Sequence, residues 1–140
     1  MNRMTKRLPH GKGRVRVLLY GPTDLEPMLD AFPGTRCLER TVHAAGGVHA
    51  EFEIGDAIVV LELNDPPYEG KSPGNLILYV DDVDATVRDA KARGFVLTRG
   101  PEVRPYGECV ASIVDSFGNT WWICSVVEQG QSQAVEPSSE

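Results

Sequence analysis

Short stretches of alternating apolar and polar residues in the first half of the chain predict β-strands that bury one face. These stretches cover residues 15–20, 37–43, 49–54 and 57–63. Between the first two, Thr23 or Asp24 is placed to cap a helix that runs to about Phe32, where a Pro-Gly pair ends it. Gly55-Asp56 predicts a tight turn between the last two strands. The first half is therefore expected to form a strand, a helix and three strands.

The second half of the chain repeats this order of elements. Its strand patterns cover residues 75–80, 95–98, 109–114 and 120–126. Asp82 or Asp84 is expected to cap a helix that continues to Arg93 and is closed by Gly94. Residues 64–74, which are rich in proline and glycine, are predicted to link the two halves.

The two halves also share sequence at a spacing of 59 residues. The repeated pairs are Leu18-Leu19-Tyr20 with Ile77-Leu78-Tyr79, Asp30-Ala31 with Asp89-Ala90, and Asp56 with Asp115. Two copies are too few for a solenoid, so the repeat predicts one domain built from two βαβββ modules.

Charge is distributed unevenly along the 140 residues, a length that suits one domain. Residues 1–16 hold six basic and no acidic residues, whereas the other 124 carry eight basic and 20 acidic residues, a net charge of −12. An acidic body argues against nucleic-acid binding, and no apolar run approaches the roughly 18 residues of a membrane span. We expect a disordered basic leader over 1–13, which includes His10, and a disordered tail over 129–140. The domain between them, 14–128, divides into modules 14–63 and 75–128.

The chain has three cysteines, Cys37, Cys109 and Cys124. An odd number without metal-type spacing indicates reduced thiols rather than a disulfide framework, and therefore predicts a cytoplasmic protein.

Two motifs in the second module connect the chain to a known family. Leu-Tyr-Val-Asp-Asp-Val-Asp (78–84) enters its helix, and Asp-Ser-Phe-Gly-Asn-Thr-Trp-Trp-Ile (115–123) closes it. With the repeat, they make residues 15–127 resemble the vicinal oxygen chelate superfamily of glyoxalases, bleomycin-resistance proteins and extradiol dioxygenases. Tyr106-Gly107 and the Trp pair are most similar to its PhnB-like glyoxalase branch. The resemblance implies an α+β fold whose modules form a curled mixed-sheet cup, a ligand inside the cup, and a homodimer.

Strand alternation indicates which side chains line such a cup. A two-residue turn at Gly55-Asp56 would place His49 opposite Glu62 and Glu51 opposite Val60, with the apolar alternate residues on the other face. The candidate ligand-binding residues are Arg16, Tyr20, His49, Glu51, Asn75, Tyr79, Tyr106 and Trp122. Aromatic walls with carboxylates suit an organic ligand that carries polar or cationic groups. Residues 99–108 are either a flap over the cup or a plain connection.

Metal-dependent members of the superfamily place His or Glu at four inward positions. In this chain those positions correspond to Arg16 or Val17, Glu62, Asn75 and Trp122. Only Glu62 is of the required type, and a divalent metal normally needs three protein ligands, so no metal or other cofactor is expected. An alternative set of His49, Glu51 and Glu62 on one hairpin stays open, as does a simple His–Glu ion pair.

Two functions therefore remain. The first is a metal-independent binding protein that sequesters a toxic or antibiotic-like organic molecule. The alternative is a metal-free or atypical enzyme, such as an isomerase, epimerase, cyclase or lyase, with Glu62 as general base. In that enzyme Asn75, Tyr79 or Arg16 would stabilise developing charge.

Overall fold

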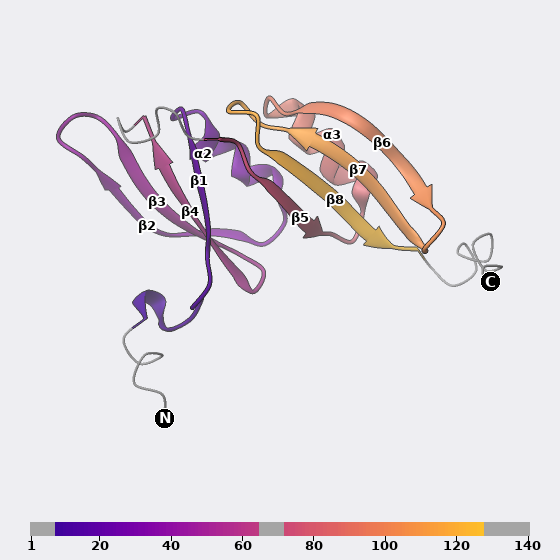
Figure 1. Ribbon diagram of the computed structural model, residues 1–140, viewed down its shortest axis with the longest axis horizontal. Coiled ribbons are helices and arrows are strands. Elements are labelled where there is room, and N and C mark those ends of the chain that lie inside the picture. Colours follow the sequence, from indigo (N-terminus) through magenta and orange to yellow (C-terminus); the bar gives the residue numbers. More distant parts are fainter. Residues whose placement is uncertain (1–7, 65–71, 128–140) are drawn as a thin grey trace. The chain divides into compact units, whose positions relative to one another are not determined.

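The computed structural model describes residues 8–64 and 72–127. Contacts divide the chain into two compact units, residues 1–72 and 73–140, and the division falls within the predicted linker. Each unit contains one four-stranded sheet, with the order β1-β4-β3-β2 in the first and β5-β8-β7-β6 in the second (Figure 1). The shared strand order confirms the predicted α+β class with two βαβββ modules. Most of the leader, most of the linker and the tail lie outside the described residues.

The first unit begins with a short 3-10 turn and continues as predicted into a strand, a helical segment and three strands. The elements are η1 (Pro9–Gly11), β1 (Val17–Gly21), α2 (Leu25–Met28), η2 (Leu29–Ala31), β2 (Thr35–Val42), β3 (Val48–Ile54) and β4 (Ala57–Leu63). β1 runs parallel to β4, and the other neighbours are antiparallel.

The predicted first helix is shorter than a regular α-helix. One α-turn is followed by a 3-10 turn, and the Asp24 side chain at the N-cap makes no capping hydrogen bond. A segment this short gains little from helix propagation, so its position depends on packing. Leu25 and Leu29 are fully buried, and Phe32 is only 2% exposed.

The register of the central hairpin confirms the turn prediction. His49 pairs with Glu62, Glu51 with Val60, and Phe52 with Val59. Gly55 has φ +61°, as the first central residue of a type II′ turn requires. The apolar alternate residues are buried as expected: Ala50, Phe52, Ile54, Val59 and Leu61. The polar side chains of β3 and β4 therefore project from the opposite face.

The second unit packs one amphipathic helix against its sheet. Its elements are β5 (Asn75–Tyr79), α3 (Val83–Ala92), β6 (Val96–Arg104), β7 (Glu108–Val114) and β8 (Thr120–Val126). Asp82 caps α3 by accepting a hydrogen bond from the Ala85 backbone N–H at 3.0 Å, and Gly94 follows the helix with φ +104°. α3 packs against the sheet formed by β6, β7 and β8 (Figure 1), and its residues Val87 and Ala90 are buried. Within the described ranges, no helix is both long and apolar enough to cross a membrane.

The segment predicted as a flap or connection, residues 99–108, is mostly strand. β6 continues to Arg104 and pairs with β7, so only residues 105–107 form a turn. The sequence prediction ended this strand at Thr98 because Gly100-Pro101 resembles a strand terminator. β6 is an edge strand that tolerates proline at irregular positions, and its register shifts on both sides of Arg99. Residues 99–104 are therefore an edge strand rather than a loop, and a flap formed by this segment stays a prediction.

A buried turn joins β7 to β8 and explains the motif that closes the second module. Asp115 is 5% exposed, and its Oδ1 accepts the backbone N–H groups of Phe117 and Asn119 at 3.1 and 3.0 Å. Its Oδ2 accepts the Trp121 indole N–H at 3.0 Å. The Asn119 side-chain oxygen accepts the backbone N–H of Gly74 at 2.7 Å, which ties the start of β5 to the same turn. The motif therefore organises this end of the sheet.

Candidate functional site

One face of the first sheet carries a group of carboxylates around an imidazole. We call this the acidic face and define it by Glu39, Glu51, Glu53, Glu62 and His49. Pairing between strands places Glu39 beside Glu51 and His49 beside Glu62. Among the four glutamates of the acidic face, Glu51 is the most buried, at 7% exposed. Buried carboxylates require hydrogen-bonding partners, and the partners of Glu51 define the centre of the face.

His49 bridges two carboxylates of the acidic face. Its Nδ1 lies 2.6 Å from Glu62 Oε2, and its Nε2 lies 2.8 Å from Glu51 Oε2. Burial disfavours the charged ring, but the hydrogen bonds to Glu62 and Glu51 outweigh it and raise the pKa of His49 above 6.5. The same network lowers the pKa of Glu51 below 4.5, against the opposing effect of burial. The arrangement therefore favours an imidazolium that donates from both nitrogens.

The bridge predicts a stabilising contribution that depends on pH. Because the pKa of His49 is higher in the folded state, its contribution is fully present below pH 6.5 and is lost as pH rises through the folded pKa. We expect the stability difference between the wild type and His49→Gln to shrink as pH rises above 6.5 in urea unfolding. A difference that stays constant across this window would contradict a protonated bridge.

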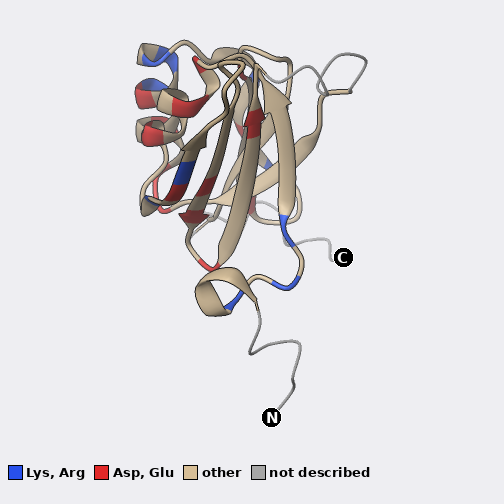
Figure 2. Cartoon of the chain, turned by 90° about the vertical axis from the view of Figure 1, so that its left-hand side faces the viewer, with Lys and Arg blue, Asp and Glu red and all other residues tan. Residues whose placement is uncertain are grey.

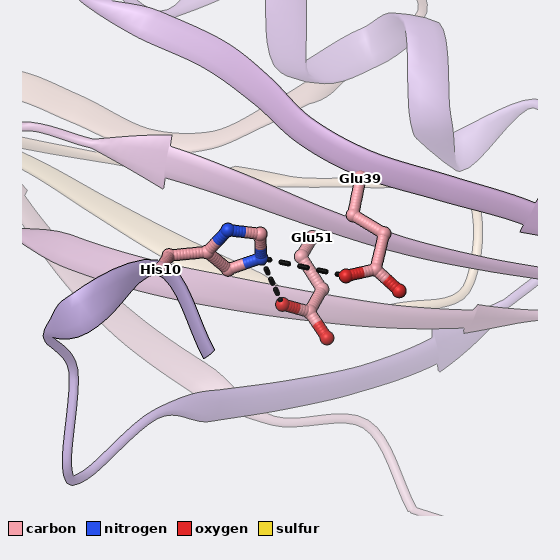
Figure 3. A group of neighbouring side chains, drawn as sticks. All are labelled: His10, Glu39 and Glu51. Atoms are coloured by element: carbon pink, nitrogen blue, oxygen red, sulfur yellow. Dashed lines mark hydrogen bonds and ion pairs between the residues drawn. The ribbon is translucent and has the colours of Figure 1, made fainter. Parts of the chain in front are cut away.

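The described end of the predicted leader lies on the acidic face. His10 Nε2 is 2.9 Å from Glu51 Oε1 and 3.4 Å from Glu39 Oε1 (Figure 3). Lys12 forms an ion pair with Glu53. The sequence predicted a disordered leader over residues 1–13, and in the structure His10 and Lys12 of this segment contact the acidic face. The uneven charge along the chain was the sequence signal for this contact, because a basic arm and an acidic body attract.

Arg16 holds this segment in shape. It lies just before β1 rather than inside the first strand. Its guanidinium donates to the backbone oxygens of Pro9, Lys12 and Gly13 at 2.6, 2.9 and 2.8 Å. It also donates to Glu51 Oε1 at 3.3 Å. Figure 2 shows basic positions on the stretch between η1 and β1 and acidic positions on strands. Arg16 was predicted to bind a ligand, but three of these four hydrogen bonds go to backbone oxygens of residues 9–13.

Gly13 allows the segment to approach the sheet closely. A Cβ at this position would lie 2.8 Å from the Ile58 Cδ1 atom, and Gly13 has φ +77°, which favours glycine. Ile58 lies on β4 and has no exposed surface. A side chain at position 13 would therefore collide with Ile58, which explains the glycine at this point.

Two groups of side chains bear on metal binding. One ligand atom from each of His10, Glu39 and Glu51 lies within 4.8 Å of the others, a set of nitrogen and oxygen donors that suits a transition metal. Arg16 donates to the same Glu51 oxygen that His10 contacts, so an ion there would face a guanidinium. In the alternative set, His49 uses opposite ring nitrogens toward Glu51 and Glu62. That geometry is a bridge rather than three donors converging on one point.

One face of the second sheet exposes aromatic and apolar side chains. We call this the aromatic face and define it by Asn75, Ile77, Tyr79 and Trp122, which share one side of the paired strands β5 and β8. Ile77 is 67% exposed and Tyr79 is 57% exposed, whereas the neighbouring Trp121 points to the other side and is 1% exposed. Large apolar groups left at the surface mark a surface suited to a partner or ligand.

Polar contacts order the aromatic face. The Trp122 indole N–H donates to the Asn75 side-chain oxygen at 3.3 Å. The Tyr79 hydroxyl donates to Glu108 Oε2 at 2.8 Å, and this hydrogen bond to a carboxylate raises the pKa of Tyr79. Glu108 was not among the predicted site residues, and no local sequence signal identified it. Asn75 and Trp122 are the two residues of this unit that were aligned with metal-ligand positions of the superfamily. In this structure they are hydrogen-bonded to each other.

The other predicted site residues take different positions. Tyr20 pairs with Glu62 across β1 and β4 and is half-buried. Tyr106 lies in the turn between β6 and β7 and is 65% exposed. The first unit thus brings together Arg16, Tyr20, His49, Glu51 and Glu62, and the second brings together Asn75, Tyr79 and Trp122.

The second unit also contains an open cleft of about 410 Å³ at the start of α3. Asp81, Asp82 and Asp84 line it together with Cys109. Burial raises the pKa of the Cys109 thiol, and Asp84 and Asp82 raise it further. A thiol with a raised pKa is a poor nucleophile at neutral pH, so this cleft lacks an activated cysteine.

Comparison with known families identifies the class of the protein. Residues 10–123 match the model of the Glyoxalase/Bleomycin resistance protein/Dioxygenase superfamily. The chain belongs to this superfamily, which confirms the resemblance found in the sequence. The finer assignment to a PhnB-like branch stays a prediction. A comparison with curated proteins finds no match.

Solved structures of low sequence identity share the fold. TioX from Micromonospora sp. ML1 is 24% identical, with a TM-score of 0.61 over 81% of this chain and 99% of that one. TnmS3, an antibiotic-binding protein from Streptomyces sp. CB03234, is 22% identical, with a TM-score of 0.59 over 80% and 95%. The fosfomycin resistance protein FosX from Listeria monocytogenes is 11% identical, with a TM-score of 0.65 over 84% and 96%.

Proposed function

We propose that the protein binds a small, antibiotic-like organic molecule and sequesters it without a metal. The observation that carries this proposal is the aromatic face of the second sheet. Folding leaves Ile77 and Tyr79 exposed beside Trp122, on strands whose other side is well packed. Flat aromatic surfaces with a few ordered polar groups bind organic molecules by stacking and apolar contact.

Family membership and the named functions of relatives support this proposal. One relative of the same fold is an antibiotic-binding protein, and another is a fosfomycin resistance protein. The acidic face supplies charges that suit a ligand with a cationic group. A cytoplasmic location, assignment to the PhnB-like branch and a homodimer complete the proposal. All three cysteines are free thiols, which suits a reducing compartment.

Metal independence is argued from the residues at the superfamily's ligand positions. Glu62 is the one usual metal ligand among them, and it is bonded to His49. Asn75 and Trp122 are bonded to each other. Arg16 is positively charged and holds the backbone of residues 9–13. These donors do not form the three-ligand set that a divalent metal normally requires.

The enzyme alternative would use Glu62 as its base. Glu62 is 26% exposed in its side chain and accepts a hydrogen bond from His49 at 2.6 Å, so its carboxylate already holds a cationic partner. A base engaged in this way must break that bond to accept a proton from a substrate. The arrangement therefore favours the binding function over proton abstraction.

A ligand screen tests the proposed function. Purified protein is screened by thermal shift against aromatic antibiotics, and hits are titrated by tryptophan fluorescence. We expect Trp122→Ala to weaken binding of a hit by about tenfold, a loss typical of one stacked aromatic contact. Val42→Ala is the control, because Val42 is an exposed apolar residue, 59% exposed, on β2 of the first unit and is not a candidate ligand-binding residue. Chelator treatment should leave the affinity unchanged.

Three outcomes would contradict the proposal. A ligand whose affinity falls on chelation would show that binding needs a metal. Turnover of a bound ligand that is lost in Glu62→Gln would support the enzyme alternative instead. Equal losses in Trp122→Ala and Val42→Ala would remove the aromatic face from the site. Light scattering of the purified protein tests the expected homodimer separately.

A further inference from the structure

We propose that residues 9–16 act as an internal cationic ligand of the acidic face, which an amidinium or guanidinium compound must displace in order to bind. We call these residues the basic strap. This inference rests on the proposed function and specifies the class of ligand that the acidic face accepts. It also gives a role to the basic arm, which a binding function alone leaves unexplained.

Charge complementarity is the first argument. The acidic face carries four carboxylates: Glu39, Glu51, Glu53 and Glu62. Within the sheet, two cations offset them, since Arg36 lies 2.6 Å from Glu53 and His49 bridges the central pair. The sheet alone therefore leaves a net charge of −2. Of the three basic residues of the strap, Lys12 and Arg16 form ion pairs with this face. Their two positive charges balance the remaining −2, before Arg14 and any charge on His10 are counted.

The shared acceptor is the second argument. His10 Nε2 and Arg16 Nη1 both approach the same atom, Glu51 Oε1, at 2.9 and 3.3 Å. Each is a nitrogen of a planar, delocalised group. A ligand that replaces them needs planar N–H donors aimed at one buried carboxylate, which amidinium and guanidinium groups provide.

The strap is largely exposed and holds its own turn. None of the residues in its 3-10 turn is buried, and the Lys12 side chain is 46% exposed. Gly13, where an added Cβ would collide with Ile58, contributes no side chain that would hold the strap to the sheet. The ion pair of the half-exposed Lys12 contributes little net stability and weakens with salt. The contacts of His10 and Arg16 with Glu51 are more buried, and a planar ligand cation that replaces them leaves Glu51 paired. Arg16 bonds three strap carbonyls, so the strap keeps its turn while Glu51 is released.

Benzamidine is the test compound, because it combines an amidinium with an aromatic ring, and neutral benzamide is its matched control. The full-length chain is compared with the double variant H10Q/K12Q, which weakens the strap and keeps Arg16. If the strap covers the face for about nine-tenths of the time, its release makes benzamidine binding about tenfold tighter. Benzamide affinity should not change between the two proteins.

The backbone NMR signals of Gly11 and Gly13 report on the strap directly. We expect benzamidine to shift both signals in the full-length protein toward their positions in H10Q/K12Q. Without ligand, 0.5 M salt should shift them in the same direction, because salt at this concentration reduces the Debye length to about 4 Å and weakens the ion pairs. E51Q should bind benzamidine more weakly than the wild type.

Distinct results would overturn this inference. Equal benzamidine affinities in the wild type and H10Q/K12Q, with unchanged glycine signals, would exclude competition by the strap. Absence of benzamidine binding to both proteins would exclude the ligand class. Neither result depends on Trp122, so an antibiotic that binds through the aromatic face would leave the proposed function standing. Conversely, benzamidine competition without any antibiotic hit would support the strap and refute the proposed function.

Discussion

Asp115→Ala is expected to lower the free energy of unfolding of the second unit by about 3 kcal/mol, the cost of removing a buried, multiply bonded carboxylate. The substitution deletes the acceptor for the Phe117 and Asn119 backbone N–H groups. It also leaves the indole N–H of Trp121, a side chain that is 1% exposed, without this acceptor. Urea unfolding monitored by tryptophan fluorescence measures the change.

The repeat supplies a matched control for this prediction. Asp56 is the counterpart of Asp115 in the first module, but it is an exposed residue in the two-residue turn after β3. We expect Asp56→Ala to change stability by no more than about 0.5 kcal/mol, as exposed substitutions usually do. Similar losses in both variants would mean that the Asp115 network is not what stabilises the module.

Glu51→Ala is expected to cost about 2 kcal/mol, because charge-assisted hydrogen bonds to a buried carboxylate contribute more than neutral ones. Glu51 accepts from His49 and Arg16 and lies 2.9 Å from His10. Its loss should also lower the pKa of His49, since one of the two carboxylates that raise it is removed. Urea unfolding followed by circular dichroism measures the stability, and an NMR titration follows the His49 ring.

Glu39→Ala provides the comparison for Glu51. Glu39 lies on the edge strand β2, its side chain is 43% exposed, and its ion-pair contact with His10 is 3.4 Å. An exposed pair of this kind contributes about 0.5 kcal/mol or less. If Glu39→Ala destabilised the protein as much as Glu51→Ala, the central position of Glu51 in the network would be refuted. An unchanged His49 titration in Glu51→Ala would refute the bridge.

The alternation of apolar and polar residues was sufficient to predict most strands, because a strand that buries one face has an apolar side chain at every second position. The register of the β3–β4 hairpin was predicted correctly, since Gly55-Asp56 forms a two-residue turn and a one-residue slip would move the apolar side chains of one strand to the opposite face. Residues 99–104 were predicted incorrectly for the opposite reason. A glycine, a proline and two register shifts interrupt the period there, and only pairing with β7 maintains the strand.

The candidate site was predicted in part. Alternation placed His49, Glu51 and Glu62 on one face, and the structure brings them into one hydrogen-bonded group. The same rule could not place Arg16 in its contacts with Pro9 and Gly13, because those contacts depend on a turn without periodicity. The uneven charge along the chain indicated that the basic segment and the acidic body attract, but it could not indicate which residues form the ion pairs.

The sequence by itself determined the family, the two-module α+β fold and the faces of the residues in the β3–β4 hairpin. These follow from periodicity, turn residues and motifs such as 115–123, whose effects act within a few residues. The tertiary structure alone decided that His49 bridges two carboxylates, that Asn75 and Trp122 bond to each other, and that a basic segment covers the acidic face. Those features depend on side-chain distances of about 3 Å between segments far apart in the chain, and only the folded sheet sets such distances.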